Sequence, residues 1–410
     1  MTEAQANIFE KSVQLLKKIS QNWIFLLVLF LGLSLFGASH SYFRSINYDG
    51  PSCQVYSTYQ VFKYSHFHLL SDQDLYGGHP HEHCYSYKYS PTFALVFGIF
   101  ANLSDFWGIY FWEILAAIVG FLALSKLPNL SWPQKSAFLI LIIFELIVCL
   151  QNQQTNGLIA MMLILAWIML EKQQYIGATG LIMATGFIKI FGLAAILLFL
   201  FYPKKFKLGL FSLIWAAIFF ALPLLVVSPQ ELWSMYEAWQ ARTLTDYGAN
   251  VGMSIFSFLD TTIGLSLDKT IIQIVTLLVM GATVFQWKKW PFQWFRLLSL
   301  SMILIWVVPF NHKAESSTYI IAAIGIVLWY FSGPRKWPDH LLLGICLFLL
   351  SVIFSDLVPR WIKNDVAFHY HVKALPATIM WIRVVVEMWM RKDCGFVNAE
   401  KTNLELAPNS

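Results

Sequence analysis

Long apolar runs recur along this chain from Asn22 onward, and short polar loops separate them. A helix needs ~20 residues to cross ~30 Å of hydrocarbon, and somewhat fewer where the bilayer thins. Only 12% of the 410 residues are charged, about half the share that is typical of soluble domains. So few charges do not cover the surface of a globule of this size. The sequence therefore predicts an all-α polytopic membrane protein whose main partner is the lipid bilayer.

The apolar runs predict about twelve transmembrane helices. The expected spans are 22–39, 107–125, 136–150, 157–170, 175–188, 190–203, 208–228, 270–287, 297–310, 316–331, 341–355 and 374–390. The polar segment 1–21 has no small-residue cleavage site after it, which favours a retained anchor over a cleaved signal. We expect a cytoplasmic segment at 1–21, one transmembrane domain at 22–390 and a cytoplasmic tail at 391–410.

Basic residues gather in alternate loops, which predicts the orientation. Lysine and arginine prefer cytoplasmic loops, and an inside N-terminus places nearly every basic cluster there. These clusters are Lys126 and Lys135, Lys172, Lys204 to Lys207, Lys288 to Arg296, Arg335 and Lys336, and Arg391 and Lys392. We expect a plasma (inner) membrane protein with both termini inside. Because the net charge of +5 is spread over these loops, it does not indicate nucleic-acid binding.

Two long, aromatic loops, 40–106 and 229–269, then face the periplasm or exterior. In the first, the apolar spacing at 59–70 and the short apolar stretch at 92–104 predict interfacial or re-entrant helices, because a full crossing at 92–104 would invert every later basic loop. Any active site is expected on this outer face.

The hairpin LQNQQTNG lies between two short spans and carries five carboxamides. Asn152, Gln153 and Asn156 offer hydrogen-bond donors and acceptors without charge, which suits sugar hydroxyls or a pyrophosphate. The alternative is a helical hairpin that caps itself.

Charged residues at the outer ends of spans suggest a second part of the site. Lys189, in GFIKIFG, is costly at a membrane boundary unless it snorkels or meets an anion such as phosphate. In FNHKAESSTY, Glu315 could accept a proton, His312 could orient or donate, and Lys313 could hold a phosphate. The alternative for this turn is an ionic cluster that satisfies itself.

The segment GGHPHEHC places His79, His81 and His83 at alternate positions. An extended strand would turn the three imidazoles to one side, where they could bind zinc or copper. We favour a hydrogen-bonding surface loop over this metal site. Cys84 shares the loop with Cys53, and an oxidising compartment would permit a disulfide between them.

Several short segments together resemble glycosyltransferase family 87, the polyprenyl-phosphate-sugar-dependent mannosyltransferases and their relatives, also called the DUF2029 family. They occur in the same order as in that family over most of residues 40–330. The segments are Val61-Phe62, Leu69-Leu70, Asp74-Leu75-Tyr76, Tyr87–Pro91, LQNQQTNG, GFIKIFGLAAILLFLFYPKK, NVGMSIFSFL and FNHKAESSTY.

The resemblance implies a GT-C bundle that moves a hexose, such as mannose, from a polyprenyl-phosphate carrier to a hydroxyl of a glycan or glycolipid, usually with inversion. The family's general base is an aspartate three residues before a Val-Tyr pair, and Thr58 occupies that position here. Asp49, Glu315 and Glu82, in that order, become the candidate bases. No cofactor or metal is expected, because a lipid monophosphate leaves with modest charge.

The remaining expected site residues are those that would bind the phosphate of the donor and those that would bind the sugar or the acceptor. Candidate phosphate ligands are Lys189, Lys313 and Arg242. Candidate sugar or acceptor ligands are Asn152, Gln153, Asn156, Tyr76, Tyr89 and Asn250. Two other functions stay open. A lipid or glycolipid transporter or flippase would use the polar hairpins as a substrate path, although no inverted repeat is visible. The second alternative is a catalytically inactive GT-C-like assembly protein, which is supported by Thr58 at the position of the family's aspartate.

Overall fold

The structure of the protein is a computed structural model that describes residues 20–46, 56–248, 252–311 and 313–391. All the regular secondary structure among these residues is helical. The chain folds into two compact units whose segments alternate along the sequence. The first comprises Met1–Ala194, Phe206–Asn250 and Glu315–Ile321, and the second comprises Ala195–Lys205, Val251–Ala314 and Ala322–Ser410.

The first unit holds most of the long helices. Its helices are α2 (Trp23–Ile46), α3 (Ser57–Leu70), α4 (Pro91–Ala101), α5 (Asp105–Lys126), α6 (Trp132–Leu141), α7 (Ile143–Gln151), α8 (Asn156–Glu171), α9 (Tyr175–Ile188), α10 (Lys205–Ala221), η3 (Leu222–Leu225), α11 (Pro229–Gly248) and η5 (Ser316–Thr318). The 3-10 helix η2 (Ile190–Phe201) and helix α15 (Tyr319–Phe331) run from one unit into the other.

The second unit is built from shorter helices. These are α12 (Ile255–Ile263), α13 (Lys269–Val284), η4 (Trp287–Lys289), α14 (Gln293–Trp306), α16 (Trp337–Leu350), η6 (Val352–Phe354), the π-helix η7 (Ile362–Phe368) and α17 (Ala374–Met390). Helix α17 packs against both α14 and α16. Near its C-terminal end, Glu387 accepts a hydrogen bond from Trp329 and forms an ion pair with Arg335.

Four helices within the described residues are long and apolar enough to cross a membrane, which indicates a membrane protein. They are Trp23–Ile46, Asp105–Lys126, Lys205–Leu225 and Trp337–Phe354. Helices α6 and α7 pass the same test together but are bent by 59°. The span expected at 136–150 falls on this bent pair of helices. Most of the other expected spans coincide with shorter apolar helices, so twelve crossings stay a prediction.

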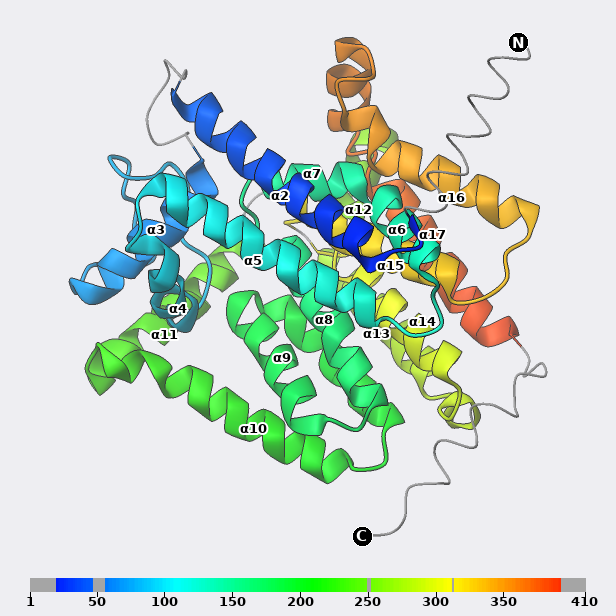
Figure 1. The fold of residues 1–410 in the computed structure, drawn as a ribbon, viewed down its shortest axis with the longest axis horizontal. Coiled ribbons are helices and arrows are strands. Elements are labelled where there is room, and N and C mark those ends of the chain that lie inside the picture. The colour runs from blue at the N-terminus through cyan, green and yellow to red at the C-terminus, as the bar shows by residue number, and fades with distance from the viewer. Residues whose placement is uncertain (1–19, 47–55, 249–251, 312, 392–410) are drawn as a thin grey trace. The chain divides into compact units, whose positions relative to one another are not determined.

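Within the first unit, α2 lies along α5, and α8 lies along α9 (Figure 1). Helix α3 packs on α4, and both contribute to an aromatic cluster. Phe62 stands at its centre, with ring centroids 4.8 Å from Tyr89, 5.0 Å from Phe93 and 5.2 Å from Phe97. Edge-to-face rings at these separations stabilise one another beyond their burial. The cluster fixes the chain on either side of Tyr89.

Helix α4 begins where its sequence predicts. The Ser90 hydroxyl accepts a hydrogen bond from the Phe93 backbone N–H, and Pro91 occupies the first turn, where its missing N–H has no cost. The segments expected to form interfacial helices, 59–70 and 92–104, thus correspond to α3 and α4. Their position at a membrane surface stays a prediction.

Candidate functional site

A cavity of about 330 Å³ lies in the first unit, and segments far apart in the sequence line it. They are the start of α3, the loop before α4, the end of α7 with the carboxamide hairpin, the residue after α9, and the start of η5. The lining residues are Ser57, Thr58, Val61, Phe62, Tyr85, Ser86, Lys88, Tyr89, Val148, Asn152, Gln154, Lys189, Glu315, Ser316 and Ser317. Cations, a carboxylate, carboxamides and two tyrosines therefore share one cavity.

Lys189 is held in place by its neighbours. Helix α9 ends at Ile188, and Lys189 follows it in extended backbone. Its ammonium group donates a hydrogen bond to Asn156 Oδ1 over 2.9 Å and stands 5.3 Å from the centre of the Tyr89 ring. A cation over an aromatic face is stabilised by the ring's quadrupole. Lys189 is half-buried, so its charge faces the cavity from a fixed point.

Asn156 connects two walls of the cavity without lining it. Its side chain is fully buried, and its Nδ2 group donates to the carbonyl of Ser317 over 3.1 Å. Its Oδ1 atom accepts from Lys189. Each end of the carboxamide therefore has a hydrogen-bond partner, and the structure gives Asn156 a supporting position. Its expected contact with a sugar stays a prediction.

Gln153 also supports the hairpin from within. Its backbone has φ 48°, in the left-handed region that side chains rarely adopt. Its buried Nε2 group donates to Ser41 Oγ over 2.6 Å and to the Leu150 carbonyl over 3.2 Å, while Trp112 donates to its backbone carbonyl. These bonds tie the hairpin to α2 and α5. Gln153 is absent from the walls of the large cavity, and its expected contact with a sugar or acceptor stays a prediction.

Asn152 and Gln154 are the two carboxamides of the hairpin that line the cavity. Asn152 is exposed, and its Nδ2 group donates to the Val148 carbonyl over 2.7 Å, so Oδ1 is the atom left for a ligand. Gln154 donates to Thr58 Oγ1 over 3.3 Å, and its buried Oε1 atom has no hydrogen-bond partner. The sequence did not indicate Gln154 as a site residue. The left-handed backbone at Gln153 turns the chain, and this turn sets which carboxamides of the hairpin line the cavity.

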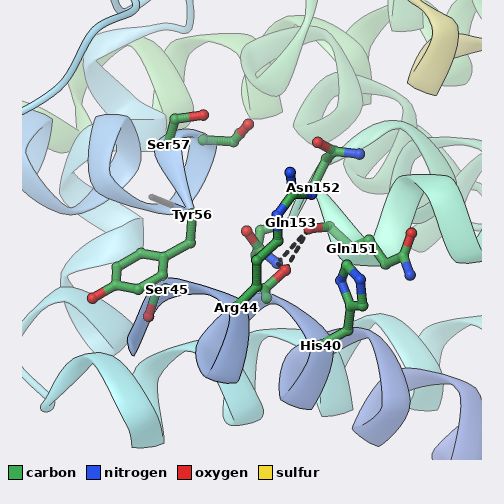
Figure 2. Close-up of a pocket in the computed structure, with 10 residues that line it drawn as sticks. His40, Arg44, Ser45, Tyr56, Ser57, Gln151, Asn152 and Gln153 are labelled. Atoms are coloured by element: carbon green, nitrogen blue, oxygen red, sulfur yellow. Dashed lines mark hydrogen bonds between the residues drawn. The ribbon is translucent and has the colours of Figure 1, made fainter. Parts of the chain in front are cut away.

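A second, smaller pocket of about 210 Å³ adjoins the first and shares Ser57, Thr58 and Asn152 with it. Figure 2 shows Arg44 and His40 on α2 with their polar groups near the hairpin. Every residue that lines this smaller pocket carries a polar group in its side chain. The lining residues also include Ser41, Ser45, Tyr56, Gln151 and Gln153. Arg44 and His40 were not among the expected site residues, although Arg44 is the basic residue in the last turn of α2.

Tyr89 and Glu315 complete the charged side of the larger cavity. Burial raises the pKa of Tyr89, while the Lys189 charge opposes that shift and the Glu315 charge adds to it. Tyr89 therefore stays a neutral hydroxyl between the two. Glu315 is the exposed N-cap residue of η5, and Lys88 adds a second cation to the walls. Lys88 was missed although it stands inside the Tyr87–Pro91 segment.

The other expected residues lie elsewhere. Tyr76 is in the aromatic core, where its hydroxyl donates to the Tyr89 carbonyl over 3.0 Å. Glu82 pairs with His68 outside the cavity. Arg242, on α11, is not among the lining residues, and Lys313 belongs to the second unit. Three expected residues lie outside the described part of the chain: Asp49, His312 and Asn250.

The histidine-rich loop differs from the extended strand considered from the sequence. Residues 79–83 form a turn, in which the backbone N–H groups of Glu82 and His83 donate to the His79 carbonyl. This turn brings His79 and His83 together and leaves His81 exposed. Cys84 is disulfide-bonded, and Cys53, its expected partner, lies outside the described residues.

The sequence model of glycosyltransferase family 87 matches residues 87–355. The chain belongs to glycosyltransferase family 87. This family 87 protein is therefore a glycosyltransferase. The matched range begins at Tyr87 and includes three of the five segments that line the cavity, together with part of a fourth, the loop before α4. It does not reach Thr58. No curated protein matches the chain.

Proposed function

We propose that this enzyme transfers a hexose, mannose in the first instance, from a polyprenyl-phosphate carrier to a hydroxyl group of a glycan or glycolipid. One observation carries the proposal: Lys189, Glu315 and the two carboxamides Asn152 and Gln154 line the same cavity. A lipid-phosphate sugar presents an anion next to a polyhydroxylated ring. Cations suit the first part, and uncharged donors and acceptors suit the second.

In the proposed reaction, the acceptor oxygen attacks the anomeric carbon while the bond from that carbon to the phosphate oxygen breaks. The acceptor proton passes to the carboxylate of Glu315, which acts as general base. The electron pair of the broken bond stays on the lipid phosphate, where Lys189 and Lys88 stabilise the developing charge. Attack opposite the leaving group inverts the anomeric configuration. The lysines balance the modest charge of a monophosphate, so the proposal includes no catalytic metal.

The smaller pocket suits the acceptor. It meets the larger cavity at Ser57, Thr58 and Asn152, and its other walls offer Arg44, His40 and several hydroxyl and amide groups. An acceptor sugar placed there would direct one hydroxyl toward the donor. Thr58, at the position of the family's aspartate, supplies a hydroxyl in place of a carboxylate. The base must then come from another segment, and Glu315 is the carboxylate that lines the cavity among the described residues.

We place the cavity on the extracytoplasmic side of a GT-C-like helical bundle, with both termini inside, because the basic loops alternate with the segments that form the site. An impermeant thiol reagent applied to intact cells tests this orientation. Asn152→Cys, at an exposed position of the hairpin, should be labelled from outside, whereas Lys205→Cys should be labelled only after permeabilisation. The reverse pattern would contradict the orientation.

The chemical role is tested by a transfer assay in membranes with radiolabelled polyprenyl-phosphate mannose. Glu315→Gln should lower the turnover rate by about 10²- to 10⁴-fold, the usual contribution of a general base, without weakening donor binding. Glu237→Gln, at an exposed acid on α11, is the matched control and should retain activity. Transfer that is unaffected by Glu315→Gln but abolished by Asp49→Asn would make Asp49 the base.

The transporter alternative gives a different result in the same membranes. If lipid-linked sugar crosses the bilayer in a protein-dependent manner, and neither Glu315→Gln nor Lys189→Ala changes any glycan product, the transferase mechanism proposed for this cavity is wrong.

A further inference from the structure

Three imidazole rings and a carboxylate gather where α3 ends. His68 lies in the last turn of α3, and His79, Glu82 and His83 come from the turn that follows. The His68 and His79 ring centroids are 3.8 Å apart, and His83 is 6.1 Å from the first and 5.6 Å from the second. The Glu82 carboxylate is 2.6 Å from His68 Nε2. One ligand atom each from His68, His79 and Glu82 lies within 4.8 Å of the others.

The hydrogen bonds of His79 leave a ring nitrogen suited to a metal. Its Nε2 atom is 2.8 Å from the carbonyl of Asp74, and because a carbonyl only accepts, Nε2 must carry the proton. In the neutral ring, Nδ1 then holds the lone pair. Metal-binding histidines usually donate their other N–H to a carbonyl or carboxylate in this manner.

Two further histidines carry buried nitrogens without partners. His68 is 2% exposed and His83 is 3% exposed, and the Nδ1 atom of each has no hydrogen-bond partner. A buried polar atom left unsatisfied costs about 1–3 kcal/mol. Two buried nitrogens are therefore left unsatisfied in the group of residues that also holds the Glu82 carboxylate.

We propose that His68, His79 and Glu82 bind a divalent transition metal ion, with zinc as the first choice. Histidine nitrogen with carboxylate oxygen is a common zinc ligand set, and three protein ligands leave a fourth position for water. His83 borders the site and can supply that ligand after a small shift of its ring. None of these four residues lines the cavity described above, so the ion has no part in the proposed transfer reaction.

The ion would stabilise the wall of the cavity from a distance. It would join the end of α3 to the turn at 79–83, and the chain continues from this turn to Tyr85, Ser86, Lys88 and Tyr89, which line the cavity. The disulfide at Cys84 already restrains the same turn. A metal that closes a loop stabilises the folded state because the unfolded chain does not hold its ligands together.

The test uses the full-length protein in detergent, purified with a tag that contains no histidine. After dialysis against zinc and gel filtration, elemental mass spectrometry should find about one zinc per chain. His79→Ala and Glu82→Gln should each lower that content at least fivefold. His81→Ala, an exposed histidine of the same turn that stands outside the cluster, should leave it unchanged.

Thermal unfolding provides a readout that does not depend on activity. Zinc should raise the Tm of the wild type and of His81→Ala, and it should not raise the Tm of His79→Ala. Wild-type protein that elutes free of zinc after this dialysis would overturn the proposal. Loss of zinc from His81→Ala as large as that from His79→Ala would also overturn it.

Discussion

The ammonium group of Lys189 donates a hydrogen bond to Asn156 Oδ1 over 2.9 Å, and the opposite end of that carboxamide donates to the Ser317 carbonyl over 3.1 Å. One buried side chain thus connects the cation that follows α9 to the segment that carries Glu315. The distance between these two charges depends on Asn156, and so does the geometry of any ligand that contacts both.

Asn156→Ala should raise the KM for the lipid-phosphate donor about tenfold, because a hydrogen bond to a charged group contributes about 1.5–3 kcal/mol and only part of that reaches the ligand. Lys189→Ala should raise the same KM further. In the double variant, Asn156→Ala should add little, since its effect passes through Lys189. Steady-state kinetics of the four proteins measures the coupling. Two effects that simply multiply would show that Asn156 acts independently of Lys189.

Lys88→Ala should also weaken donor binding, by about three- to tenfold in KM, with a smaller effect on the acceptor. Lys88 lines the cavity beside Tyr89, and a second cation shares the phosphate charge. Lys172→Ala, at the exposed C-terminal end of α8, removes the same charge from outside the cavity. Equal kinetic parameters for the two variants would exclude Lys88 from the donor site.

Gly108→Ala should destabilise the first unit. A Cβ atom at Gly108 would stand 1.8 Å from the Tyr59 hydroxyl and 2.8 Å from the Phe100 carbonyl. Relief of such a contact requires movement of α3 against α5, at a cost of about 1–3 kcal/mol. Gly32→Ala, in α2, meets no atom within 4 Å and should leave the Tm unchanged or slightly higher. A Gly108→Ala protein as stable as wild type would show that this packing is wrong.

Glu387→Gln should destabilise the second unit by about 3 kcal/mol, because it removes the carboxylate that pairs directly with the buried Arg335. The Arg335 and Glu387 side chains are 5% and 12% exposed and 2.8 Å apart. Unfolding in detergent with increasing denaturant measures the loss. Asp356→Asn, which breaks the exposed pair with Lys363, should have little effect. An equal loss of stability in the two variants would show that the buried position of the Glu387–Arg335 pair does not increase its contribution to stability.

Lys189 and Glu315 could be predicted from the sequence, because a charged side chain at a membrane boundary is costly unless it has a partner. Both residues line the cavity. The choice among the carboxamides was different. Gln153 and Asn156 are buried supports, whereas Gln154 faces inward. Composition cannot distinguish them, because the left-handed backbone at Gln153 sets the direction of each side chain. Tyr76 lies in the aromatic core. The sequence did not indicate this position, because an aromatic residue suits a sugar site and a core equally well, and a sugar contact by Tyr76 stays a prediction.

The positions of the helices followed from the apolar runs, but their local shape did not. The bend between α6 and α7 lies within a continuous apolar run, at Ile142, and no proline or glycine marks it. The turn at 79–83 likewise depends on its contacts with α3. The alternate spacing of its histidines indicated His83 as a neighbour of His79, but it did not indicate His68.

We propose that Lys189, the hairpin carboxamides and Glu315 form one site for a lipid-linked sugar. A density map of the full-length enzyme with bound polyprenyl-phosphate mannose tests it most directly. We expect the phosphate within hydrogen-bond distance of Lys189 Nζ and the sugar between Glu315 and the side chains of Asn152 and Gln154. A donor bound with its phosphate away from Lys189, or in the second unit alone, would contradict it.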